Sequence, residues 1–432
     1  MKNRVLIRND LLDDKSPKNA IVTQLTSDTE ISGAHLYMEA HVFSPDSKKI
    51  ILERSGTAHG PNRDDANHRY MLCDLENPNE LIPLTDELNA RAPSFSPDGE
   101  YVYYFVDNSN INSGHIELKR VKPDASKRET LLVIDTPLKG ASNLLSLLYP
   151  LSTISSDGKM LACSGFLGDG QNDNCPWCVF VIDLQTMHIE IVWQDIFVSN
   201  AHPQFSRSID EEDKHCLMIQ HNHGYLRDAQ GRELSRNDSL GADIHIIGDN
   251  ATKFQTVALG RADKPVIEHC QGHQCWRGRT NWIISAMYVK QSEANKDKDK
   301  KNQKVMLPLM EAFPIEHTAH IGKFTPNAIR NDLTREFSNP QFAHFSTDIE
   351  GEKLVTDYLY NIDEQHIQQH IYLMQLGRHG TDAAKSLRYI LNTKSYFRKE
   401  SHAHPFLSPD GTKIFFNSDE SGILQAYMIE CF

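Results

Sequence analysis

The chain has 432 residues, of which 39% are hydrophobic and 24% are charged. This composition is ordinary for a soluble globular protein with a large buried core, and it excludes a chain that is disordered throughout. The formal net charge of −13 argues against a general nucleic-acid binder, because phosphate recognition needs a concentrated basic surface. An anionic small substrate is not excluded, since a local cluster of histidine and arginine side chains can reverse the field inside one cleft.

Nothing in the sequence indicates export or membrane insertion. Residues 1–8 have too short an apolar part for a signal peptide, and acidic residues follow at once. No apolar run reaches the roughly 18 residues that a membrane span needs. We therefore expect a cytoplasmic protein with no membrane partner.

The eight cysteines stand at irregular positions, which fits reduced thiols better than a disulfide framework. Cys175 and Cys178 have the spacing of a redox or zinc pair. No βαβ pattern surrounds them, and the other close pair, Cys270 and Cys275, has the wrong spacing. We interpret Cys175 and Cys178 as part of a hairpin between short strands.

A short turn motif recurs along the chain: an apolar residue, then Ser-Pro-Asp or a close variant. The copies begin at Phe43, Phe95, Ile154, Phe205, Phe345 and Leu407. Their serines, at positions 44, 96, 155, 206, 346 and 408, are 52, 59, 51, 140 and 62 residues apart. Because 140 is two units of 70, we expect one degenerate copy in the long interval. Residues 275–278, followed by 282–285, fill that place and bring the number of copies to seven.

Each copy is followed by strand-like segments. Residues 101–106 are an example of a first strand, residues 179–184 of a second and residues 190–193 of a third. Short strands repeated at this length predict four-stranded blades around an axis. We therefore predict an all-β fold, a single seven-bladed β-propeller over residues 1–432. Its blades are expected to start near residues 38, 90, 149, 200, 268, 340 and 402.

The N-terminal segment is expected to close the ring. Residues 20–26 resemble residues 80–85, which precede the second copy of the turn as the outer strand of a blade. Residues 18–27 would then supply the outer strand of the last blade, which starts near residue 402. Such a closure leaves fewer bare sheet edges.

Two segments depart from the repeat. Residues 296–304 are rich in lysine and aspartate, which predicts a solvated loop inserted in the fifth unit. Residues 224–242 form a long connection in the fourth unit that contains Arg227, Arg232 and Arg236. Long loops on a rigid scaffold are frequent places for function.

Histidines concentrate just before the turns, where the innermost strand of each blade should line a central channel. The window from six to two residues before each turn serine covers 35 positions in seven copies. The 21 histidines among 432 residues would place about 1.7 there by chance. The windows contain His41, His202, His273, His344, His402 and His404.

His402 and His404 form a His-x-His pair. On a strand, both side chains would project from one side about 7 Å apart. A lone histidine is most simply a satisfied core residue, but several neutral imidazoles that converge on a wet channel are a common ligand set for a transition metal. We predict that His344, His402 and His404 bind a metal ion. His273, in a neighbouring unit, is a candidate general base.

From about residue 200 to the end, the sequence resembles the oligogalacturonate lyases. Before residue 200 the likeness is limited to the repeat and to the placing of Cys175 and Cys178. The specific likenesses are residues 201–203, His221, and residues 272–276, 343–346 and 401–405.

The resemblance implies a seven-bladed cytoplasmic propeller that splits short pectin oligomers by β-elimination with a divalent metal. The ion would be Mn²⁺, with Zn²⁺ or Ca²⁺ as alternatives, held by His344, His402 and His404. His273 would abstract the proton. The partner would be an anionic oligosaccharide, and the protein a monomer or a homodimer. The residues expected to bind this substrate are His202, His221 and Tyr225.

Two positions differ from the family. A glutamine ligand is expected three residues before His402, where this chain has Lys399. A family arginine is expected where this chain has Asp243, and Arg227 on the nearby long connection is our first candidate for its catalytic replacement. These departures leave open a lyase of the same type that acts on another uronate glycan such as ulvan.

An alternative interpretation from a different functional class is a non-catalytic propeller such as TolB or the accessory propeller of prolyl oligopeptidases. The turn repeat cannot separate these, because fold does not give function. The histidine set favours an enzyme, since a scaffold has no need of a His-x-His pair before its last turn.

Overall fold

A computed structural model gives the structure of the protein. It describes residues 2–55, 65–198, 200–236, 240–248, 253–257, 268–290, 305–313, 315–316, 330–362, 366–398 and 401–432. Within these ranges the chain is almost entirely β-strand and loop, and the one helix is the short 3-10 helix η1 (Asn9–Leu11). The expected all-β fold is thereby confirmed. None of the described helices is long and apolar enough to cross a membrane.

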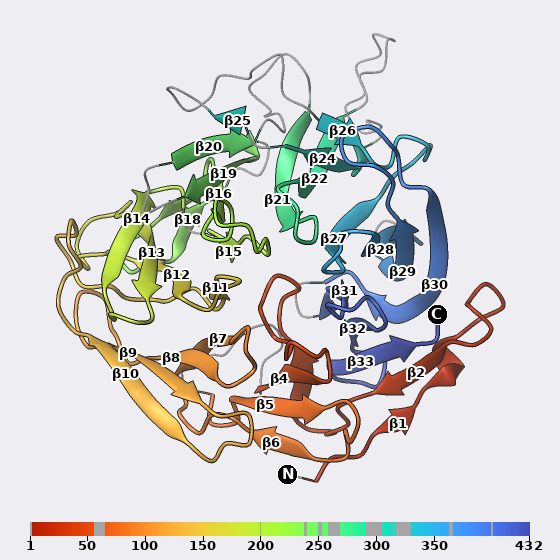
Figure 1. The fold of residues 1–432 in the computed structure, drawn as a ribbon, viewed down its shortest axis with the longest axis horizontal. Helices are drawn as coiled ribbons and strands as arrows, with labels where there is room; N and C mark the ends of the chain where they lie inside the picture. Colours follow the sequence, from red (N-terminus) through yellow and green to blue (C-terminus); the bar gives the residue numbers. More distant parts are fainter. Residues whose placement is uncertain are drawn as a thin grey trace.

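The strands form antiparallel sheets that stand around a common centre, as in a β-propeller (Figure 1). Two of the sheets have four strands in simple sequence order. The first contains β7 (Ala90–Phe95), β8 (Val102–Asp107), β9 (Ile116–Val121) and β10 (Arg128–Ile134). The second contains β11 (Thr153–Ile154), β12 (Met160–Phe166), β13 (Trp177–Asp183) and β14 (Ile189–Asp195).

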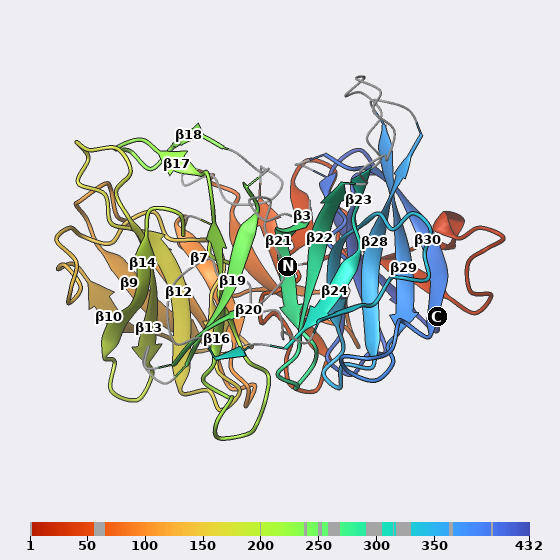
Figure 2. The ribbon, with the colours of Figure 1, turned by 90° about the horizontal axis from the view of Figure 1, so that it is seen from above.

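A third four-stranded sheet follows later in the chain, and a small hairpin stands apart from the sheets. The third sheet contains β27 (Phe342–Thr347), β28 (Lys353–Asn361), β29 (Ile367–Gln375) and β30 (Ser386–Tyr396). The hairpin consists of β17 (Leu226–Arg227) and β18 (Glu233–Ser235). It lies at the upper edge of Figure 2, above the strands β16 (Leu217–Asn222) and β19 (Ala242–Gly248).

A ten-stranded sheet lies between the sheet of β14 and that of β27. Its strands β15 (Gln204–Phe205), β16, β19 and β20 (Lys253–Val257) are joined to the following strands through a β19–β21 pairing of one residue pair, Ala242 with Cys270. The later strands are β21 (Glu268–Trp276), β22 (Ile283–Lys290), β23 (Val305–Met306), β24 (Leu309–Ala312), β25 (Ile315–Glu316) and β26 (Arg330–Asp332). The lysine-rich loop expected at 296–304 lies outside the described residues.

The two ends of the chain share a nine-stranded sheet. It contains β1 (Leu6–Ile7), β2 (Ile21–Gln24), β3 (Ser32–His35), β4 (Lys49–Ser55), β5 (Arg69–Asp74), β6 (Leu81–Pro83), β31 (Phe406–Leu407), β32 (Ile414–Ser418) and β33 (Gln425–Glu430). β2 pairs antiparallel with β33 from Ile21 opposite Glu430 to Gln24 opposite Tyr427. β3 joins β33 through one parallel pair, Gly33 with Gln425.

Neighbouring sheets pack face to face through apolar side chains. One core cluster joins Phe105 and Leu118 of the β7–β10 sheet to Leu161, Cys163 and Phe180 of the β11–β14 sheet. All five side chains are fully buried. Contacts of this kind fix each sheet against the next and point the inner strands toward the centre (Figure 1).

The repeated turn has a local chemical cause. The Ser44 hydroxyl donates to the Asp46 carboxylate at 2.6 Å and accepts the Lys49 amide at 2.9 Å. Ser155 repeats the pattern with Asp157 at 2.7 Å and the Met160 amide at 3.0 Å. Each serine thus bridges the loop between the innermost strand and the next one.

Arg277 replaces this chemistry in the degenerate copy of the turn. Its guanidinium, which is buried, donates to the Glu311 carboxylate within its own sheet. The same guanidinium donates to the carbonyl oxygens of Gly351 and Gly377 in the adjacent β27–β30 sheet. Arg277 therefore ties two neighbouring sheets together at a point where the serine turn is missing.

We expect Arg277→Met to lower the free energy of unfolding by roughly 3–5 kcal/mol, because it leaves the buried Glu311 without its guanidinium partner. Urea unfolding followed by tryptophan fluorescence measures the change. Arg279→Met is the matched control, because the Arg279 side chain is 49% exposed and its contact with Glu350 is long, with 3.8 Å between Nη1 and Oε1. Equal unfolding midpoints for the two variants would contradict this account of the turn.

Candidate metal centre and catalytic channel

Four of the channel histidines stand on irregular backbone. His273 lies in the register shift of β21 between Cys270 and Gln274, and His344 lies in that of β27 between Phe342 and Phe345. A bulge of this kind re-aims a side chain.

His202 and His404 instead adopt the left-handed conformation, with φ of 42° and 43°. Such a conformation costs a non-glycine residue on the order of 1–3 kcal/mol and is concentrated at functional sites. The left-handed backbone also corrects one expectation. His402 and His404 precede β31 in irregular chain and do not alternate along a strand, and their rings are 5.2 Å apart at 89° to each other.

His344, His402 and His404 come together. Their potential ligand atoms all lie within 4.8 Å of one another, which leaves room for one ion between them. His344 and His404 are buried, and His402 is partly exposed. The Phe397 ring stacks on His402 at 4.3 Å, and the Tyr37 ring stands against His404 at 4.7 Å. The imidazoles are thus held in place by aromatic neighbours.

Asp357 on β28 determines which nitrogen of His344 faces the cluster. The His344 Nδ1–H donates to Asp357 Oδ2 at 2.7 Å, and the backbone amides of Ala343 and His344 donate to Asp357 Oδ1. This leaves the Nε2 lone pair of His344 for a metal ion. A carboxylate behind a ligating histidine is the usual outer partner at metal sites. The donor set therefore fits a divalent cation.

His273 stands directly beside this cluster. Its ring is 4.5 Å from the His344 ring, centroid to centroid, and its Nδ1–H donates to the Ala343 carbonyl oxygen at 3.0 Å. Burial lowers the pKa of His273 well below its usual value, and the nearby His344 lowers it further. A neutral imidazole with Nδ1 protonated presents the Nε2 lone pair as a base.

His202 forms a buried pair with Glu39. The His202 Nδ1–H donates to Glu39 Oε2 at 2.7 Å. Burial raises the pKa of the Glu39 carboxyl, while the contact with His202 lowers it. The Tyr37 ring, 5.2 Å from His202 and 6.3 Å from His344, links the pair to the metal cluster. Sequence reasoning missed Glu39, because nothing in its own segment indicates a partner 163 residues away.

The other expected site residues belong to the long connection and its surroundings. His221 packs among Trp193, Phe197 and His245. The Arg227 guanidinium lies over the Trp177 ring at 5.3 Å and donates to the Gly231 carbonyl oxygen.

Tyr225 lies on the same connection, with the Arg236 guanidinium 5.0 Å over its ring. Asp243, at the position of the expected family arginine, accepts a hydrogen bond from His223 Nε2 at 3.0 Å. Lys399 lies outside the described residues.

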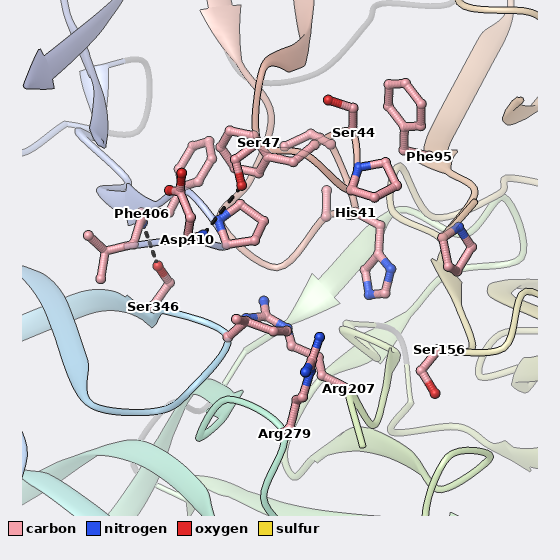
Figure 3. Close-up of a pocket in the computed structure, with 18 of the residues that line it drawn as sticks. His41, Ser44, Ser47, Phe95, Ser156, Arg207, Arg279, Ser346, Phe406 and Asp410 are labelled. Carbon is pink, nitrogen blue, oxygen red and sulfur yellow. Dashed lines mark hydrogen bonds between the residues drawn. The ribbon is translucent and has the colours of Figure 1, made fainter. Parts of the chain in front are cut away.

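His41 is not part of the metal cluster. It lines a cavity of about 420 Å³ among the serine turns, together with Arg207 and Arg279 (Figure 3). Burial lowers the pKa of His41 to about 3. Of the six histidines in the sequence window, His41 is the one that lines this cavity.

Two solved structures match this chain over its whole length. The oligogalacturonate lyase of Vibrio parahaemolyticus matches with a TM-score of 0.65 and 15% identity, covering 100% of this chain and 97% of that chain. An oligogalacturonate lyase in complex with manganese matches with a TM-score of 0.65 and 16% identity, covering 99% and 98% of the two chains. The chain is similar in fold to these lyases. The expected resemblance is confirmed at this level, and it extends over the first 200 residues as well.

The likeness in fold is not confined to lyases. The tricorn protease matches with a TM-score of 0.52 and 9% identity, covering 96% of this chain and 34% of that one. No protein-family model and no curated protein matches the sequence. The activity must therefore be argued from the side chains of the channel.

Proposed function

We propose that the protein is a polysaccharide lyase that cleaves short uronate oligosaccharides by metal-assisted β-elimination and releases 4,5-unsaturated products. One observation carries the proposal: three imidazoles gather their ligand atoms within 4.8 Å directly beside His273, whose Nδ1 is already hydrogen-bonded. The fold shared with two oligogalacturonate lyases supports it.

We further propose that the scaffold has seven blades. The ten-stranded and the nine-stranded sheets would each consist of two blades, because a single residue pair joins their halves. The blade completed by β2 would then be the last one, with β31, β32 and β33 inside it. This count places His273, His344 and His404 in consecutive blades.

The proposed ion is Mn²⁺, with Zn²⁺ and Ca²⁺ as alternatives, and its ligands are His344, His402 and His404. Bound there, a divalent ion would neutralise the carboxylate of the uronate and stabilise the negative charge that develops when the C5 proton leaves. Asp357 orients the His344 ring toward it. One of the two matching lyases is described in complex with manganese, which supports this choice of metal.

His273 is the proposed base. Its Nε2 takes the C5 proton of the uronate, the C5–H electron pair forms the C4–C5 double bond, and the C4–O4 bond breaks. The low pKa of His273 keeps the ring neutral at neutral pH, so that no proton has to leave it first. The departing O4 oxygen takes a proton from water or from an acid, for which Tyr225 is our candidate.

The remaining site residues are proposed to hold the anionic chain. His202, oriented by Glu39, lies beside the Tyr37 ring, which also contacts the metal ligands His344 and His404. Tyr225 and Arg227 lie on the long connection and would contact the sugar chain. His221 is buried against Trp193 and Phe197 and would support the base of this connection. Arg227 would supply the positive charge that the family places at the position of Asp243. The sugar is proposed to be galacturonate, with the uronates of other glycans such as ulvan as the alternative.

We expect the double variant His402→Ala/His404→Ala to lose at least about 10³-fold in rate, because the site loses two of its three ligands. The assay follows the ultraviolet absorbance of the unsaturated product from short galacturonides and ulvan oligomers, before and after chelation and Mn²⁺ addition. His188→Ala on an exposed turn is the control. Full activity of the double variant, or no product from any uronate, contradicts the proposal.

His273→Gln should reduce kcat by on the order of 10²–10⁴-fold, because the general base is lost. Calorimetric titration with Mn²⁺ should give wild-type affinity, since His273 is not among the proposed ligands. His188→Gln serves as the matched control. A loss of metal binding together with activity would show instead that His273 is a ligand.

Asp357→Asn should weaken Mn²⁺ binding by about 10–100-fold. An asparagine amide facing His344 would favour the tautomer that carries its proton on Nε2, and this nitrogen could then not bind the ion. Calorimetry measures the change, with Asp124→Asn in an exposed turn as the control. Unchanged affinity would mean that Asp357 does not position His344.

A further inference from the structure

A second group of metal-type side chains lies outside the channel. His221 on β16 and Asp243 and His245 on β19 have potential ligand atoms that all lie within 4.8 Å of one another, and all three are buried. His221 is directly opposite Asp243 in the strand pairing, and His245 follows two residues later. Side chains opposite each other and two apart lie on one face of a sheet.

This face is turned toward the neighbouring β11–β14 sheet. The Trp193 ring of β14 lies 5.9 Å from His221 and 5.7 Å from His245. Phe254 of β20 stacks on Trp193 at 4.9 Å and stands 4.8 Å from His245. The cluster is therefore enclosed between two sheets by aromatic rings, in surroundings where each ring nitrogen needs a partner.

The nitrogen positions fit two ligands of one ion. His221 Nδ1 and His245 Nε2 are 3.2 Å apart. Two nitrogens on a tetrahedral zinc ion, with bonds of about 2.0–2.1 Å, are separated by about 3.3–3.4 Å.

Both rings also have an oxygen at the opposite nitrogen. Thr256 Oγ1 is 3.1 Å from His245 Nδ1, and Asp195 Oδ1 is 3.4 Å from His221 Nε2. The Thr256 oxygen is an outer hydrogen-bond partner of the kind that orients a ligating histidine, whereas Asp195 makes only a charge contact with His221.

Asp243 completes the set. One of its oxygens, Oδ2, is 3.0 Å from His223 Nε2, so His223 holds the carboxylate in place across the pair of strands. Two imidazoles and one carboxylate form a recognised zinc ligand set, with a fourth position for water. The ligands come from the end of β16 and the start of β19, and residues 223–236, which include β17 and β18, follow β16 outside the sheet (Figure 2).

We propose that His221, Asp243 and His245 form a second metal site, which binds a divalent ion of the zinc class and fixes the root of the connection that carries β17 and β18. This site is independent of the proposed lyase reaction. The alternative is a chain of hydrogen bonds from Thr256 through His245 to His221 without an ion.

The test uses the full chain with the channel site removed. Protein carrying His402→Ala/His404→Ala is stripped with a chelator, equilibrated with Zn²⁺, desalted and analysed by mass spectrometry for metal. We expect about one equivalent of zinc to remain, and none when His221→Gln and His245→Gln are added. No retained zinc in the channel variant would overturn the proposal and leave the hydrogen-bonded chain.

A conservative variant covers the case in which the double glutamine change does not fold. Asp243→Asn in the same background should lose the retained zinc, the rise in Tm on zinc addition and the visible absorbance of a tetrahedral Co²⁺ complex. Retention of all three by Asp243→Asn would exclude Asp243 as a ligand. None of these measurements uses lyase activity, so the failure of one proposal is distinguishable from the failure of the other.

Discussion

Burial of both faces of each sheet is the constraint on which the architecture depends. Strands β8 and β16 are buried at every position, with none of the alternation of a half-exposed strand. A sheet of this kind needs a neighbour on each side, and a ring provides two neighbours for every sheet. Because the sheets stand around one centre, their inner strands converge. Glu39 and His202, 163 residues apart in the chain, consequently meet at 2.7 Å.

The orientation of the histidine rings at the centre depends on the two nitrogens of each imidazole. A buried ring nitrogen without a partner is costly, and one ring nitrogen of His202, of His273 and of His344 bonds to a protein oxygen. The Asp357 carboxylate accepts the hydrogen bond from His344, and the Ala343 carbonyl oxygen accepts the one from His273. The tautomers are thereby set before any ligand arrives, which is the preorganisation that a catalytic site needs.

The sequence allowed the local chemistry and the grouping of the metal histidines to be predicted. Hydroxyl, carboxylate and amide lie within five residues in the Ser44 turn, so the repeat and the all-β fold follow from short-range pattern. His344, His402 and His404 all fall within the six residues before a turn serine, which indicated that they lie near one mouth of the channel. The left-handed backbone of His404 could not be predicted, because a non-glycine residue gives no local signal for it.

Partners from other strands could not be predicted either. Asp357 is a lone carboxylate inside an apolar strand, which indicated a special role for it. The sequence did not indicate that its partner is His344. The contact of the Arg227 guanidinium with Trp177 also could not be predicted, because Trp177 belongs to another sheet. Spacing along the chain indicates how far along its strand a residue lies from the turn. Its contacts depend on strand register and on which sheet is adjacent.

The sharing of one sheet by both ends of the chain has a consequence for biosynthesis. The partner of β2 is β33, which is made about 400 residues later. Until β33 is made, the edge of β2 that will pair with it has no partner strand. That edge can form non-native pairings with other segments of its own chain or with other chains. Closing so long a loop is also entropically slow. Completion of the ring thus depends on β33 pairing with a strand that was made about 400 residues earlier.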